Sequence, residues 1–229
     1  GLAKCRFAAE DCEKAIEACD FALAADDKCG EAYAYRGHSY FYLNNSDAAI
    51  EDYKKAIKYK ALPPEMGYMF LGLTYSNKEA WKEADDYYQR VIDRFIEEGL
   101  GNSPLLIDTY TNKAVAASRL GKYEEAHQLC KKAIAIQPDD PAIYLAEGKL
   151  YIQENQKKKA VKSFDKALTM EPSAEMWYMV ASAYSDAEYL YQAKLCFQEA
   201  YRIDPNYADI AEKLSEVFAN MPVSSTKGA

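Results

Sequence analysis

Small and aromatic residues return along this chain in a fixed order about every 34 residues. Within residues 123–151, Ala126 and Ala133 lie seven positions apart, Pro138 follows them, and Gly148 comes next. Later copies carry the alanine and proline marks as Ala160, Ala167 and Pro172, and then as Ala193, Ala200 and Pro205. Residues seven apart share one face of a helix, and a proline after them ends it. A self-similar unit of this length predicts a helical solenoid, in which each unit packs only on its neighbours.

The composition and charge of the chain limit its class and its partners. Of the 229 residues 49% are hydrophobic, with only 10 glycines and 8 prolines, which disfavours disorder. Lysine and arginine number 28 against 36 acidic residues, so the net charge of -8 disfavours nucleic acid as a partner. No stretch approaches the roughly 20 apolar residues of a membrane span, and no long apolar segment opens the chain. These features favour a cytoplasmic protein with no membrane partner, and leave an exported or processed form open.

The cysteines and histidines follow no pattern typical of a metal or catalytic site. Cys5, Cys12 and Cys19 are seven apart, so within one helix neighbours would lie about 10 Å apart, beyond the roughly 7 Å that a disulfide tolerates. No cysteines form a CxxC pair, and neither a phosphate loop nor a nucleophile elbow is present. His38 and His127 are far apart in the array. We therefore predict core thiols, no metal, no cofactor and no enzymatic activity.

Turn signals divide the chain into units of two helices. Residues 2–25 are predicted to be helical, with a break near residues 10–12 where the repeat phase places a turn. The segment from Gly99 to Pro104 is predicted to be an inserted turn, which could dock a partner or simply lengthen a helix. The predicted organisation is a partial unit at 1–29, full repeats at 30–63, 65–98, 107–140, 141–173 and 174–207, a capping helix at 208–220, and a disordered tail at 221–229.

These units resemble the tetratricopeptide repeat (TPR), whose pattern of about 34 residues combines small residues, aromatics and a late proline at fixed positions. The resemblance covers roughly residues 11–220 and includes about five full repeats. It implies an all-α fold, a right-handed superhelical solenoid of antiparallel helix pairs, here a single solenoid over residues 1–220.

Two positions of the first helix in each unit bear on its packing. A small residue recurs as Gly37, Gly72, Ala114, Gly148 and Ala181, although glycine inside a helix costs about 1 kcal/mol relative to alanine. Close crossing of the two helices offsets that cost, with neighbouring tyrosines filling the space beside the contact. One residue earlier stand Arg36, Leu71, Lys113, Glu147 and Val180, whose long stems can pack while charged heads reach solvent. Lys113 and Glu147 could pair.

The TPR resemblance implies that the first helices line a concave groove that binds peptides or helices of other proteins. An apolar segment would bury itself in such a groove, and methionines adapt to its shape. In the other interpretation, several of these side chains pack on neighbouring helices and expose little area. The candidate residues are Tyr35, His38 and Tyr42, then Met66, Met69, Phe70 and Leu73, then Thr111, Asn112 and Val115, then Leu145, Lys149 and Ile152, and lastly Tyr178, Met179 and Ser182.

Two known TPR groove chemistries do not fit these residues. Asn112 matches the middle of a carboxylate clamp, but Met69, Leu73, Ala142 and Ala146 do not match its flanks. Asn112 is also the one residue that fits an asparagine ladder.

The sequence therefore predicts a non-enzymatic scaffold that binds a peptide or helix of another protein in an apolar groove. The alternative is a structural or self-associating segment of a larger protein or assembly, for which a homo-oligomer is possible. An RNA-binding array is disfavoured by the acidic balance. The lysines of residues 157–159, with Lys162 and Lys166, form either a contact patch or a solvated surface.

Overall fold

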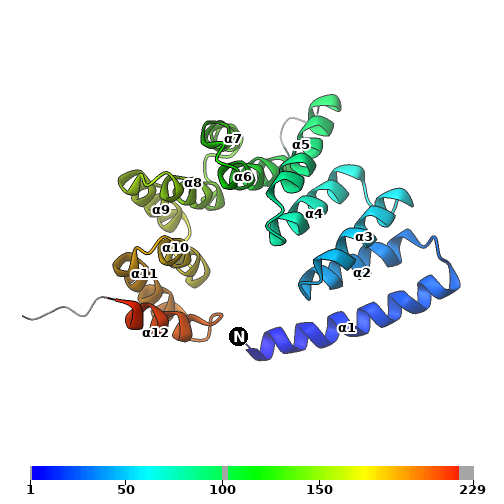
Figure 1. Cartoon of the computed structure of the whole chain (residues 1–229), viewed down its shortest axis with the longest axis horizontal. Coiled ribbons are helices and arrows are strands. Elements are labelled where there is room, and N and C mark those ends of the chain that lie inside the picture. Colours follow the sequence, from blue (N-terminus) through cyan, green and yellow to red (C-terminus); the bar gives the residue numbers. More distant parts are fainter. Residues whose placement is uncertain (1, 100–102, 222–229) are drawn as a thin grey trace, which may run out of the picture. The chain divides into compact units, whose positions relative to one another are not determined.

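The computed structural model describes the backbone of residues 2–99 and 103–221, and within those ranges the side chains from residue 11 onward. All regular secondary structure in this part of the chain is α-helical, which confirms the predicted all-α class (Figure 1). Residues 222–229 of the predicted tail and 100–102 of the predicted insertion lie outside the described residues. The helices are α1 (Leu2–Ala25), α2 (Gly30–Tyr42), α3 (Ser46–Lys58), α4 (Pro64–Asn77), α5 (Trp81–Glu97), α6 (Pro104–Arg119), α7 (Tyr123–Ile136), α8 (Pro141–Gln153), α9 (Lys157–Met170), α10 (Ala174–Asp186), α11 (Leu190–Ile203) and α12 (Ile210–Asn220).

The helices belong to two compact units, a first from Leu2 to Pro138 and a second that begins at Asp139. In the first unit α2 packs with α3, α4 with α5 and α6 with α7; in the second, α8 packs with α9 and α10 with α11. Few residues join the two helices of each pair, so the partners run in opposite directions. α6 begins at Pro104, whereas that repeat was predicted to begin at residue 107.

The first helix of every pair ends in the same backbone turn. Two positions after the last helical residue, the chain enters the left-handed region, with φ between 57° and 75°. The next residue donates its N–H to the carbonyl five positions back, as Asn45 does to Tyr40 at 2.8 Å. This Schellman motif satisfies carbonyls that a helix end leaves unpaired. The left-handed residues are Asn44, Glu79, Gly121, Asn155 and Glu188, so four of these turns carry no glycine.

Prolines explain where three of the second helices end. The residue before a proline avoids helical backbone, because the proline ring would contact it. Gln137, Glu171 and Asp204 each precede a proline and have ψ of 89°, 87° and 100°. α7, α9 and α11 accordingly end one residue earlier.

The first helix of the chain differs from the prediction. α1 runs without interruption from Leu2 to Ala25, so the predicted break near residues 10–12 is wrong. The segment contains neither proline nor glycine, and its alanines, glutamates and lysines favour a helix. α1 packs on α2 in the first unit, and α12 packs on α11 in the second.

The two helices that flank the predicted insertion are longer than the other paired helices. α5 has 17 residues and α6 has 16, whereas the other paired helices have 13 or 14. α5 ends at Glu97, and Gly99 follows with a φ of 67°.

The recurring glycines lie beneath aromatic rings from the second helix of the same pair. A Cβ added to Gly72 would stand 2.5 Å from a ring carbon of Tyr88, and one added to Gly148 would lie closer still to Phe164. Both rings are almost completely buried. The predicted close crossing is confirmed in these pairs, since only a hydrogen at the glycine leaves room for the ring.

Candidate functional site

In the first unit, contacts between side chains join the first helices of successive pairs. The ring of His38 on α2 lies edge to face against the ring of Phe70 on α4, with 4.5 Å between centroids. Oγ1 of Thr109 on α6 lies 3.6 Å from Sδ of Met69 on α4. The predicted binding residues of α2 and α4 therefore belong to adjoining helices. We call the following set the α2–α4 face: Tyr35, His38, Tyr42, Met66, Phe70 and Leu73.

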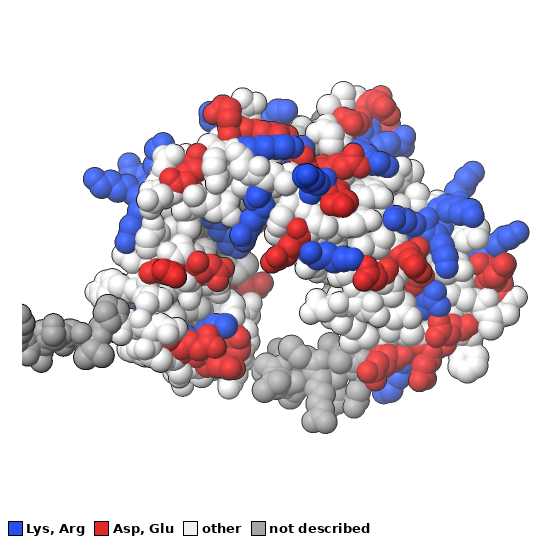
Figure 2. Space-filling view, viewed as in Figure 1, with Lys and Arg blue, Asp and Glu red and all other residues white. Residues whose placement is uncertain are grey.

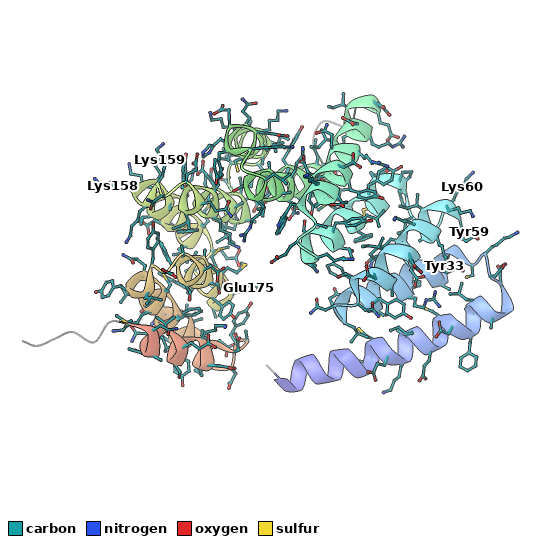
Figure 3. All side chains as sticks on the ribbon, in the orientation of Figure 1. Tyr33, Tyr59, Lys60, Lys158, Lys159 and Glu175 are labelled. Atoms are coloured by element: carbon teal, nitrogen blue, oxygen red, sulfur yellow. The ribbon has the colours of Figure 1, made fainter. Side chains whose placement is uncertain are left out.

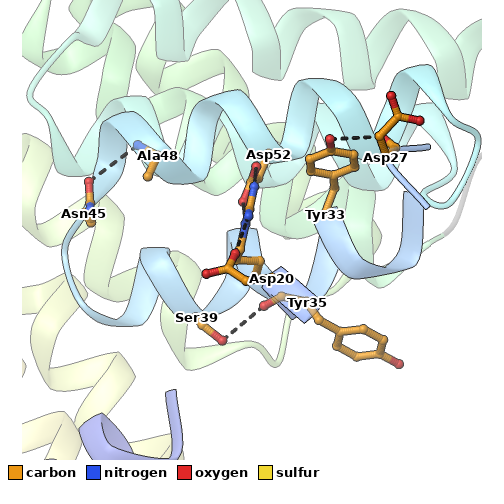
Figure 4. Close-up of polar contacts among 9 residues, drawn as sticks. Asp20, Asp27, Tyr33, Tyr35, Ser39, Asn45, Ala48 and Asp52 are labelled. Atoms are coloured by element: carbon orange, nitrogen blue, oxygen red, sulfur yellow. Dashed lines mark hydrogen bonds and ion pairs between the residues drawn. The ribbon is translucent and has the colours of Figure 1, made fainter. Parts of the chain in front are cut away.

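Two tyrosines are the most exposed members of the α2–α4 face. Tyr35 is 67% exposed and Tyr42 is 77% exposed, and Met66 is also exposed. Tyr35 and Tyr42 are seven positions apart and therefore lie on the same side of α2. Figure 4 shows the ring of Tyr35 directed away from the helices around it. Tyrosine offers a large apolar ring with a polar tip, a combination that suits contact with another protein.

The half-buried residues beside them form a packed aromatic base. Nδ1 of His38 lies 2.9 Å from the hydroxyl of Tyr53, and the ring of Phe70 stacks on the Tyr53 ring with 5.3 Å between centroids. Burial lowers the pKa of His38 and raises the pKa of Tyr53. Burial thus favours the neutral form of both groups. Leu73 is half-buried on the same helix as Phe70.

Several predicted groove residues offer little surface or have internal partners. Met69 and Leu145 are each only 6% exposed, so they cannot contribute much contact area. Three polar candidates each donate a hydrogen bond to the carbonyl four residues back in their own helix; they are Thr111, Asn112 and Ser182. Val115, Lys149, Ile152 and Met179 are half-buried.

In the second unit, the side chain of Tyr178 on α10 contacts the segment that leads into α12. Its hydroxyl donates to Oδ1 of Asp209 at 2.5 Å, and its ring lies against the rings of Phe197 and Tyr207. Burial and the hydrogen bond to Asp209 raise the pKa of Tyr178 to about 12. The sequence pattern treated Tyr178 as a groove residue, because the contact with Asp209 spans 31 positions and leaves no local signal.

A buried lysine lies among charged side chains where α6 meets α5 and α7. The ammonium of Lys113 pairs with Asp85 and, at 3.1 Å, with Glu125; its side chain is only 4% exposed. Lys122 also donates to Asp85, at 2.8 Å. Burial would raise the pKa of Asp85, but hydrogen bonds from Lys113 and Lys122 outweigh it and lower that pKa. The prediction that charged heads at this position reach solvent is wrong for Lys113.

The other charged residues at that position also have partners nearby. Arg36 donates from Nε to Asp52 at 2.7 Å and pairs with Asp20 of α1 at 2.5 Å (Figure 4). Glu147 accepts a hydrogen bond from Ser163 at 2.7 Å. These contacts tie α1 to the α2–α3 pair, and α8 to α9.

The surroundings of two cysteines and the grouping of possible metal ligands bear on the chemistry of the described residues. No group of histidine, cysteine and carboxylate side chains within the described ranges has the arrangement of a metal site. Burial raises the pKa of Cys19, and raises that of Cys196 to about 12, so neither thiol is activated as a nucleophile. None of the helices in those ranges combines the length and apolar character that crossing a bilayer requires.

Sequence profiles described as tetratricopeptide repeat match residues 30–61, 65–139, 118–184 and 174–207. The chain belongs to the tetratricopeptide repeat family. This confirms the resemblance and the helical-repeat fold that it implies. Other TPR proteins share that fold with this one at low sequence identity.

Two solved TPR structures and one curated protein illustrate this similarity. A TPR protein from Parabacteroides merdae has a TM-score of 0.72 at 19% identity, covering 91% of this chain and 78% of that one. TTC0263 from Thermus thermophilus has a TM-score of 0.67 at 20% identity, covering 83% of this chain and 100% of that one. Protein O-mannosyl-transferase TMTC3 from Homo sapiens is 28% identical over 182 residues, which is 72% of this TPR chain and 20% of that protein. The chain thus spans about a fifth of this curated relative.

Proposed function

We propose that this TPR chain is a non-enzymatic protein-interaction scaffold that binds a segment of a partner protein on its α2–α4 face. The main observation in support of this proposal is that Tyr35 and Tyr42 are 67% and 77% exposed on one side of a single helix. Large exposed aromatic rings are typical of binding surfaces, where they supply much of the affinity. A peptide or helix with apolar side chains fits this surface best.

The aromatic base supports this assignment because it limits the motion of the surface. The ring of His38 contacts both Tyr53 and Phe70, with 5.3 Å and 4.5 Å between ring centroids. A surface that is already ordered loses less conformational entropy when a ligand binds. Tyr35 and Tyr42 can then act as anchors on a fixed platform. Met66 adds an adaptable apolar contact at the start of α4.

A matched pair of double variants tests this surface. Tyr35→Ala with Tyr42→Ala removes both anchors, while Tyr191→Ala with Tyr201→Ala removes two exposed tyrosines of α11. Each chain is immobilised and used to capture proteins from the source cell, after circular dichroism confirms folding. A partner found in this way is then titrated against all three chains.

We expect the first double variant to weaken partner binding by roughly tenfold or more, since each anchor typically contributes over 1 kcal/mol. The α11 variant should bind as the wild type does. Equal affinity of all three chains, or equal losses in both variants, would contradict the proposal.

The alternative function is a structural or self-associating segment of a larger protein. The observation in its favour is that the chain matches only 20% of the length of Protein O-mannosyl-transferase TMTC3. Sedimentation velocity over a range of concentrations distinguishes the two functions. A dimer that dissociates in the Tyr35→Ala, Tyr42→Ala variant would favour self-association on the α2–α4 face.

A further inference from the structure

The exposed side of α9 carries an unusual concentration of positive charge. The helix has five lysines, Lys157, Lys158, Lys159, Lys162 and Lys166, and a single acidic residue, Asp165. All five lysines are exposed. Figure 2 shows lysine and arginine side chains gathered over the region where Figure 3 places Lys158 and Lys159, which point away from the helix. We call these five lysines the α9 lysine face.

Tyrosine rings, and not carboxylates, hold three of these ammonium groups. Lys166 lies 4.0 Å from the ring centroid of Tyr144 and donates to its hydroxyl at 2.8 Å. The corresponding distances to ring centroids are 4.3 Å for Lys157 over Tyr189 and 5.2 Å for Lys159 over Tyr151. Among the described residues, no carboxylate pairs with any of the five lysines within 4.0 Å. Cation–π contact restrains a lysine while leaving its charge unneutralised.

The positions of the lysines along α9 are electrostatically unfavourable. Residues 157–159 occupy the first turn, where the free N–H groups of a helix already carry partial positive charge and where α9 has no acidic residue. Lys158, Lys162 and Lys166 follow at intervals of four, which brings like charges together on one side. An anionic group on this side would relieve both repulsions.

We propose that the α9 lysine face binds a short acidic segment of a partner protein. A long polyanion such as nucleic acid would extend past α9 over a chain whose net charge is -8 and would be repelled there. All the carboxylates of a short segment can instead lie close to the lysines of α9. The neighbouring rings of Tyr151 and Tyr189 offer apolar contact to residues between those carboxylates. This surface is distinct from the α2–α4 face and does not depend on it.

A charge-reversal experiment tests the acidic segment directly. The probe is a fluorescein-labelled peptide of glutamates with interspersed leucines, titrated with the full chain by fluorescence anisotropy at low and physiological salt. Lys158→Glu with Lys162→Glu alters two exposed lysines that lie over no tyrosine ring in the described structure. The control, Lys14→Glu with Lys82→Glu, changes the net charge equally on exposed lysines of α1 and α5. Circular dichroism checks folding, and Lys158→Ala with Lys162→Ala replaces the reversal if that variant unfolds.

We expect the α9 variant to weaken peptide binding by roughly tenfold, and the control by less than about twofold, because local charge complementarity at α9, and not the net charge of the chain, sets the affinity. The Tyr35→Ala, Tyr42→Ala variant should bind the probe as the wild type does, which separates this result from the proposed function. Undetectable binding to wild type, or equal weakening by both charge reversals, would overturn the proposal. So would tighter binding of labelled oligothymidylate or of phosphatidylserine vesicles than of the peptide.

Discussion

At the scale of residues, the contact between Gly148 and Phe164 shows how one hydrogen atom sets the spacing of two helices. The Phe164 ring occupies the volume that a Cβ at residue 148 would need. The helix propensity that glycine forfeits, about 1 kcal/mol, is offset by burying a whole aromatic ring. At Gly72 the same helix propensity is given up, and the ring of Tyr88 is buried. Side-chain volume at this position therefore controls how closely α8 and α9 approach.

Gly148→Leu is expected to overpack this crossing and lower the free energy of unfolding by about 1 to 3 kcal/mol. Urea denaturation followed by circular dichroism measures the change. The control is Ala142→Leu, which places the same leucine side chain at an exposed position of α8 and should change stability by less than about 0.5 kcal/mol.

The same substitution in a chain that lacks the Phe164 ring shows whether that ring causes the loss of stability. In Phe164→Ala chains the obstructing side chain is absent, so Gly148→Leu should cost much less than it does in the wild type. An unchanged cost in both backgrounds would mean that the leucine does not meet Phe164.

Residue patterns predicted packing better than they predicted surfaces. The small residues at the helix crossings were recognisable because their spacing is local and periodic, and Ala49, Ala84, Ala126, Ala160 and Ala193 are indeed fully buried. The burial of Met69 was not recognisable, since it depends on Thr109, 40 positions away. The groove assignment was transferred from a motif, and a motif position does not report how much of a side chain its neighbours cover. The function of the α2–α4 face accordingly stays a prediction.

At the scale of elements, charged groups stabilise the junction of α5, α6 and α7. Lys113 enters this junction with two carboxylates, Asp85 and Glu125, and Lys122 adds a second cation. The sequence showed a lysine where an apolar residue is usual, but not its partners. Asp85 lies 28 positions earlier, in the preceding repeat, and such a pairing follows only from how consecutive repeats pack.

Asp85→Ala is expected to lower stability strongly, by up to about 3 to 5 kcal/mol, because it leaves a buried ammonium short of a partner. Lys122→Met removes a half-exposed cation from the same cluster and should cost only about 0 to 1 kcal/mol. Urea unfolding of the two variants gives the comparison. Similar losses in both would show that burial of Lys113 does not govern the cluster.

The stability that Asp85 contributes should also depend on pH in a definite direction. Its pKa is lower in the folded chain than the value of about 3.9 expected when unfolded. Its contribution is therefore complete above that unfolded pKa and is lost as pH falls through the folded pKa. The difference in unfolding free energy between wild type and Asp85→Ala should be constant from pH 7 to about 5 and shrink below about 4.

At the scale of the whole molecule, two compact units and a repeat architecture imply that stability need not be shared evenly. Within each unit, a helix packs mainly on its pair partner and then on the neighbouring pair, so a local defect should spread only a short distance. The repeat period predicted the helical repeats from sequence, but not a division into two compact units. The repeat period did not predict that α1 is one unbroken helix. Counting back by one repeat placed a turn near residues 10–12, but the sequence there contains no residue that ends a helix.

Hydrogen exchange of the Gly148→Leu chain should reveal such local behaviour. Protection of backbone amides is expected to fall most in α8 and α9, and little in α2 through α5. Mass spectrometry of peptic fragments resolves these segments. A uniform loss of protection along the chain would instead show that both units unfold in one cooperative step.

The left-handed turns at the ends of the first helices have a practical consequence for engineering. Residues other than glycine reach this conformation at a cost of about 1 to 2 kcal/mol, and Glu79 and Glu188 both occupy it. Gly121 fills the equivalent place in another pair without that cost. Substituting glycine at these turns is therefore a way to raise the thermal stability of the chain. Such substitutions leave the residues of the α2–α4 face and the α9 lysine face unaltered.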